Sequence, residues 1–114
     1  RMTEDDVRRL VRQLPETVEQ AHHGHPDFRV RNKIFATLWP KTDSSNVRLP
    51  SIAAHAAAAT EPRVYRLIND RAGCAWLTVH LPSADAQEFR ELLEEAWRLR
   101  APAELVAAYE RSAS

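Results

Sequence analysis

The sequence is short of the residues that several common functional sites require. It has two glycines in 114 residues, so a glycine-rich loop of the kind that cradles nucleotide phosphates is excluded. Its single cysteine, Cys74, excludes an intrachain disulfide and suits a reducing compartment. No base lies near Cys74 in the sequence, which predicts a buried structural thiol rather than a nucleophile.

Long apolar segments and an excess of one charge are also missing. No apolar run approaches the roughly 18 residues that span a bilayer. Sixteen basic and sixteen acidic residues cancel, so the net charge gives no general attraction to nucleic acid or to a membrane surface. The first residues form an acidic amphipathic pattern instead of a charged-then-apolar leader. These features predict a cytoplasmic protein without membrane association.

The charge is unevenly distributed along the chain. Residues 21–71 contain eight Lys or Arg against four Asp or Glu, and the two ends carry the compensating acidic excess. The central segment is therefore the basic part of the protein, and any anionic partner is expected to bind there.

Hydrophobic periodicity predicts a helix near the start of the sequence. Thr3 is a helix N-cap followed by acidic residues, and Val7, Leu10, Val11 and Leu14 then recur at helical spacing up to Pro15. Further helices are predicted over residues 51–60, 83–100 and 102–109. In the helix over residues 51–60, Ile52, Ala56 and Ala59 share one side.

Alternating apolar residues predict a β-hairpin in the basic segment. Residues 28–31 and 34–39 form its strands, Asn32-Lys33 its turn, and Arg29 and Arg31 its outer face. A further turn is expected at His25-Pro26. Residues 16–24 predict at most a short irregular strand, and residues 41–46 a polar loop.

Three more strands are expected, over residues 47–49, 64–68 and 75–81. In the last of them Leu77, Val79 and Leu81 alternate with Trp76, Thr78 and His80. The predicted fold class is α+β: a two-layer sandwich in which helices cover one face of an antiparallel sheet of about five strands. The element order is α-β(3)-α-β(2)-α-α, and residues 1–114 form one domain.

Several segments together resemble the MmcQ/YjbR-like family of small bacterial proteins. The most specific are Gly24-His25-Pro26 with Phe28-Arg29-Val30, Lys33 with Phe35-Ala36, Trp76, and Ala96-Trp97-Arg98-Leu99 before Ala101-Pro102. The resemblance covers nearly the whole chain in order. It implies an α-β(3)-α-β(2)-α fold, similar in topology to type III secretion chaperones. It also implies a DNA-binding role in which hairpins act as a double wing.

The residues predicted to bind nucleic acid are Arg29, Arg31, Lys33, Arg48 and Trp76. The cations form a row on the hairpin and the next strand, and Trp76 is a platform on which a base can stack. With so few cations on a neutral protein, DNA is expected to bind weakly and with strong salt dependence. The alternative for the cations is the ordinary solvent face of a sheet. The alternative function is a protein-interaction module that works through an exposed apolar patch or a sheet edge.

Other chemistry is weakly supported. His22, His23 and His25 lie close together, but with only Asp27 nearby they fit turn residues better than metal ligands. The glutamates of the long helix fit its polar face, and no nucleophile motif surrounds Ser44-Ser45. Trp97 is expected in the core. The sequence predicts no enzyme, no cofactor, no metal and no small-molecule substrate.

Overall fold

The computed structural model describes residues 1–113 and, within them, every side chain except that of His22. In chain order the elements are α1 (Glu4–Arg12), β1 (Thr17–His22), β2 (His25–Val30), β3 (Lys33–Trp39), β4 (Ser44–Pro50), α2 (Ser51–Thr60), β5 (Tyr65–Arg71), β6 (Cys74–His80), α3 (Ala86–Arg100) and α4 (Ala103–Ala113), with single 3-10 turns at Pro40–Thr42 and Leu81–Ser83.

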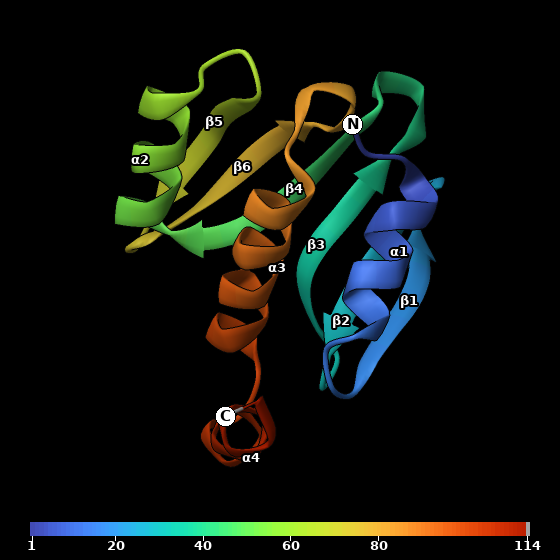
Figure 1. The fold of residues 1–114 in the computed structure, drawn as a ribbon, viewed down its shortest axis with the longest axis vertical. Helices are drawn as coiled ribbons and strands as arrows, with labels where there is room; N and C mark the ends of the chain where they lie inside the picture. The colour runs from blue at the N-terminus through green and yellow to red at the C-terminus, as the bar shows by residue number, and fades with distance from the viewer. Residues whose placement is uncertain (114) are drawn as a thin grey trace.

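The strands form one antiparallel sheet in the order β1-β2-β3-β4-β6-β5. Helices α1, α2 and α3 lie on the same side of this sheet, and α4 crosses the end of α3 (Figure 1). The predicted α+β two-layer sandwich is confirmed. The sheet has six strands instead of about five, and four of them precede α2.

Two stretches predicted as irregular are regular strands. Sequence alternation misses β1 because this edge strand buries no large apolar residue, and its Val18 is 52% exposed. It also misses the first half of β4, where Ser44 and Ser45 are buried. Their hydroxyls are satisfied there, because Ser45 donates to the Thr37 carbonyl at 2.8 Å and Ser44 shares a 2.7 Å hydrogen bond with Thr42.

Three hairpins close through two-residue turns with positive φ, at His23-Gly24, Arg31-Asn32 and Ala72-Gly73. Such turns match the twist of the flanking strands. The prediction of turns at His25-Pro26 and Asn32-Lys33 is therefore wrong by one or two residues. Arg31 is a turn residue with φ 49°, so it does not alternate with Arg29 along the strand.

The core lies between the sheet and the helices. The capping box of Thr3 and Asp6 begins α1, which buries Val7 and Val11. Helix α3 buries Phe89, Leu93, Ala96 and Trp97, as its 3.6-residue period predicts. Within residues 1–113 no helix has the length and apolar composition needed to cross a membrane.

Helix α2 does not meet the sheet through the side that carries Ile52, Ala56 and Ala59. Ala54 is its buried residue, whereas Ile52 is 83% exposed. The alanine-rich sequence has almost no amphipathic pattern, so periodicity does not indicate the buried face. Asp70 on β5 joins this helix to the sheet by accepting hydrogen bonds from Ser51 Oγ and from His55 Nε2 at 2.7 Å.

Replacing Asp70 with asparagine is expected to give a small, pH-dependent loss of stability. The hydrogen bond from Ser51, and then that from His55, hold the pKa of Asp70 below its usual 3.8. A carboxyl with a lowered folded-state pKa stabilises the fold above pH 3.8 and loses that contribution as the pH falls through the lower value. Because the pair is exposed, the melting temperatures of wild type and Asp70→Asn should differ on the order of 1–2 °C at pH 7. The two melting temperatures should converge as the pH falls below 3.8 and through the lowered pKa of Asp70; a pH-independent difference would contradict the assignment.

Candidate nucleic-acid interface

The sheet face that the helices leave uncovered carries the candidate site. On β4 and β6 the residues alternate, so that Val47, Leu49, Leu77 and Val79 are buried against the helices. Their neighbours in sequence point to the open face. This places Arg48 directly opposite Trp76 in the register of the two strands.

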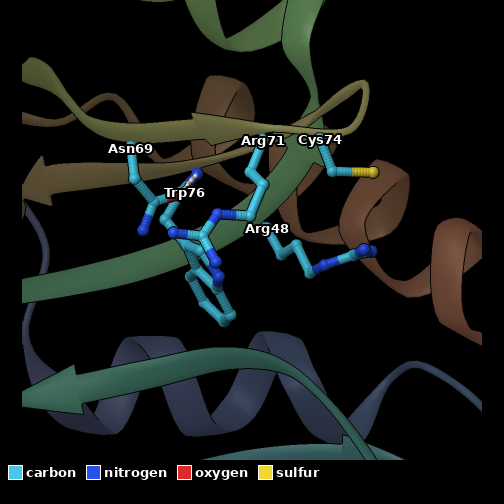
Figure 2. Close-up of a pocket in the computed structure, with 5 residues that line it drawn as sticks. All are labelled: Arg48, Asn69, Arg71, Cys74 and Trp76. Carbon is cyan, nitrogen blue, oxygen red and sulfur yellow. Dashed lines mark hydrogen bonds between the residues drawn. The ribbon is translucent and has the colours of Figure 1, made fainter.

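A hollow of about 360 Å³ lies over this pair. It is lined by Arg48, Asn69, Arg71, Cys74 and Trp76, from three neighbouring strands. Figure 2 shows the side chains of Asn69, Arg71 and Trp76 directed to the same side of the strands, whereas the side chain of Arg48 extends toward the side of Cys74. Of the residues predicted to bind nucleic acid, Arg48 and Trp76 are thus brought together.

A β-bulge in β5 explains why Asn69 and Arg71 belong to this site. Tyr65 and Leu67 face the helices, and strict alternation would send Asn69 and Arg71 to the same side. The register shifts between Leu67 and Asn69, with Ile68 as the extra residue, so that Asn69 pairs with Trp76 and Arg71 with Cys74. The bulge therefore returns both side chains to the open face.

Positive charge in this region has no carboxylate to balance it. Among residues 1–113, neither Arg48 nor Arg71 forms an ion pair, and no acidic residue lines the hollow. Arg100 reaches from the end of α3 to donate from Nε to the Ile34 carbonyl at 3.1 Å. Burial, and then the positive charge of Arg48, lower the pKa of Arg100. Its neighbourhood therefore favours an anion.

A second hollow lies on the same face, beyond Thr78. It measures about 270 Å³, and its lining includes Arg63, Arg66, Thr78 and His80. Thr78 is two residues from Trp76 along β6, which separates them by about 7 Å, and it lies opposite Arg66. We call the two hollows together the basic track. Within residues 1–113, no aspartate or glutamate that the structure describes lines either one.

Arg29, by contrast, has a structural role, because its guanidinium group is bonded to the buried side chain of Asp27. Its Nε donates to Asp27 Oδ1 at 2.9 Å and one terminal nitrogen donates to Asp27 Oδ2 at 3.2 Å, while the other reaches Asn32. Asp27 is fully buried, and its hydrogen bond raises the pKa of Arg29. The guanidinium thus serves as the counter-ion of a buried carboxylate.

Arg31 and Lys33 lie at the turn of this hairpin and do not line the basic track. Arg31 forms a two-point ion pair with Glu16 before β1, and that hydrogen bond raises its pKa. Lys33 is exposed at the start of β3 and forms no ion pair among the described residues. The continuous row of hairpin cations expected from the sequence is therefore absent.

The remaining tryptophans, and the described side chains of the histidines considered as metal ligands, lie outside the basic track. His25 stacks on Trp39 with ring centroids 3.7 Å apart, and Trp39 Nε1 donates to Thr37. His23 is in the turn, and the side chain of His22 is outside the described part. Within that part no three potential metal ligands gather. Trp97 is fully buried, as predicted.

Cys74 differs from its prediction as a buried thiol. It is half-buried at the start of β6 and lines the margin of the larger hollow. Figure 2 shows its sulfur directed away from Trp76. Strand alternation accounts for this position, since Cys74 shares the open face with Trp76, while Ala75 between them is buried.

Comparison with known proteins gives consistent matches. The model of the YjbR family matches residues 12–99. The uncharacterised proteins Rv2570 of Mycobacterium tuberculosis and Mb2600 of Mycobacterium bovis are each 32% identical to this chain, over 94% of it and 95% of their own length. The crystal structure of Deinococcus radiodurans protein DR2400, which has a DUF419 domain, is similar with a TM-score of 0.74. That similarity covers 86% of this chain and 78% of the other at 18% identity, so it supports the fold alone.

Proposed function

The chain belongs to the YjbR family, and on that premise we propose that it binds DNA without catalysing a reaction, through the basic track on the open sheet face. The observation that supports this most directly is the group of Arg48, Arg71 and half-buried Trp76 around one hollow that has no carboxylate. Unpaired guanidinium groups bind phosphate, and an aromatic face beside them accepts a base.

One groove on the helical side of the molecule has the opposite character. A groove between α2 and α3 is lined by Glu61, Glu88 and Glu91 and by uncharged residues, and no cation among the residues that the structure describes lines it. The neutral protein is thus divided into a basic sheet face and an acidic helical groove. A polyanion is therefore expected to approach the sheet face, and this orientation does not require a positive net charge.

The proposed contacts differ from a hairpin wing. Arg29 and Arg31 are already paired with carboxylates, and phosphate would have to displace those carboxylates to reach them. Arg48, Arg71, Arg63 and Arg66 form no ion pair among the described residues and line the open hollows. We therefore assign the contacts with DNA to these four arginines, because a guanidinium group has five N–H donors and can bind a phosphate and a neighbouring base edge together.

The double variant Arg48→Ala/Arg71→Ala tests the proposal. At low salt (about 50 mM) it should bind labelled DNA at least tenfold more weakly than the wild type, and the slope of log affinity against log salt should fall by about 2. Fluorescence anisotropy over a salt series measures both. The matched control, Arg12→Ala/Arg90→Ala, removes the same charge from two exposed helical residues and should bind like the wild type.

Two results would count against this assignment. Equal weakening by both double variants would show that only overall charge matters and would reject the basic track. A wild-type protein that binds neither duplex nor single-stranded DNA at low salt would reject DNA binding altogether. The latter result would favour the protein-interaction module.

A further inference from the structure

We propose that the larger hollow of the basic track holds one unpaired base of single-stranded DNA, stacked on Trp76, and that it prefers guanine. This inference rests on the proposed function and specifies its ligand. It concerns the hollow lined by Arg48, Asn69, Arg71 and Trp76, whereas phosphate binding alone requires no hollow.

Size and shape favour a single base over a duplex. The hollow of about 360 Å³ falls at the small end of the range of roughly 300–1,000 Å³ typical of small-molecule sites. Trp76 and Arg71 are directed to the same part of the hollow, and Arg48 extends from its other side, toward Cys74 (Figure 2). In a duplex both faces of an internal base are covered by its neighbours, so stacking on a protein ring needs an unpaired base.

The lining consists of hydrogen-bond donors. The Oδ1 atom of Asn69 already accepts the backbone N–H of Trp76 at 3.3 Å, which leaves the amide NH₂ group of Asn69 to face a ligand. Arg48 and Arg71 can only donate. No carboxylate of the described part of the chain lines the hollow, so a bound base must present acceptors.

Guanine meets this requirement better than the other bases. Its O6 and N7 acceptors lie side by side, and arginine donates to both at once. The proposal concerns a base that turns this major-groove edge to the arginines. On that edge adenine and cytosine each present an amino donor, which would face donors here, and thymine presents one carbonyl acceptor. The donor-only lining therefore predicts guanine first and the amino-bearing bases last.

The second hollow extends the site along the strand. Thr78 and Arg66 lie beside Trp76 and Asn69 in the register of β5 and β6, and Arg63 completes the basic lining there. A single strand that follows β6 would place one base on Trp76 and its neighbouring phosphates on Arg63 and Arg66. Flexible single strands can adopt this path, whereas the stiff duplex cannot enter the hollow.

The test uses a short oligothymidine that carries one central guanine, adenine or cytosine, with fluorescence anisotropy at low salt. The guanine oligonucleotide should bind about tenfold more tightly than the adenine or cytosine ones. Annealing each to its complement should remove the difference. Asn69→Asp keeps the acceptor for Trp76 but removes the donor, so it should abolish the guanine preference; Trp39→Ala, on the same face outside the hollow, should retain it.

Each outcome is decisive. Equal affinity for the three single strands, or equal binding of duplex and single strand, would overturn the base-selective hollow and leave DNA binding through phosphate contacts intact. A guanine preference that survives Asn69→Asp would also overturn it. Failure of every oligonucleotide to bind would overturn both this inference and the proposed function. Far-UV circular dichroism of each variant confirms that the fold is kept.

Discussion

Replacing Trp97 with alanine is expected to lower the free energy of unfolding by about 3–5 kcal/mol. Trp97 is the largest fully buried side chain of the domain. Its ring meets Tyr109 of α4 edge-on at 5.1 Å, and its Nε1 donates to the Pro15 carbonyl at 3.0 Å. One residue therefore joins α3, α4 and the segment before β1, and its loss leaves a cavity at their junction. Urea unfolding followed by circular dichroism measures the effect.

Two further variants show where this stability originates. Trp97→Phe keeps most of the apolar volume but loses the donor to Pro15, and should cost about 1 kcal/mol for that bond in addition to the smaller ring. Leu99→Ala on the same helix changes a residue that is 39% exposed and should cost clearly less. An alanine variant of Trp97 that unfolds at the wild-type midpoint would show that α4 and Pro15 are not anchored through this ring.

Replacing Arg29 with alanine is expected to lower the urea midpoint of unfolding by on the order of 1 M. The change removes the cation from a fully buried carboxylate, since Asp27 has no exposed surface and Arg29 makes two hydrogen bonds to it. A buried charge without a partner is much more costly than an exposed one. Chemical denaturation at neutral pH measures the shift.

Arg31→Ala is the matched control for this substitution. It removes an arginine from the same hairpin, but both partners of the Arg31–Glu16 pair are about half exposed. The loss of an exposed pair usually has little effect on stability, so the midpoint should stay close to that of the wild type. If the two variants are equally stable, Arg29 is not the structural counter-ion that the geometry indicates.

The sequence predicts most of the fold because the spacing of apolar residues indicates which face of each helix or strand is buried. The alternation of Leu77, Val79 and Leu81 and the helical stripe that contains Phe89 and Trp97 are direct consequences of one buried face. Hydrophobic periodicity does not indicate a strand where the strand forms without burying apolar side chains. Strand β1 is held by backbone pairing with β2 at the sheet edge, and the start of β4 buries serines whose hydroxyls find partners.

The candidate site is only partly predictable for a related reason. Arg48 and Trp76 lie on regular strands, so their shared face follows from counting residues. Arg29 and Arg31 also alternate in sequence, but a buried aspartate and a turn with positive φ change their roles. Counting residues does not place Asn69 and Arg71 on the open face. The bulge at Ile68 adds one residue to β5, so that the residues after it point to the opposite face from the one that alternation predicts. One sequence signal of such a bulge exists. The alternation that points Tyr65 and Leu67 toward the helices would also point positions 69 and 71 there, yet these positions hold the polar residues Asn69 and Arg71.

The same bulge has a consequence for how the protein behaves in a crowded solution. Strand β5 is an outer strand of the sheet, and its free backbone groups are a template on which another chain could add a strand and begin to aggregate. The extra residue at Ile68 interrupts the regular spacing of those groups, and charged Arg66, Asp70 and Arg71 flank the interruption. Bulges and charges are the features by which natural proteins protect exposed edges. The irregularity that brings Asn69 and Arg71 beside Trp76 therefore also protects this edge against unwanted strand addition.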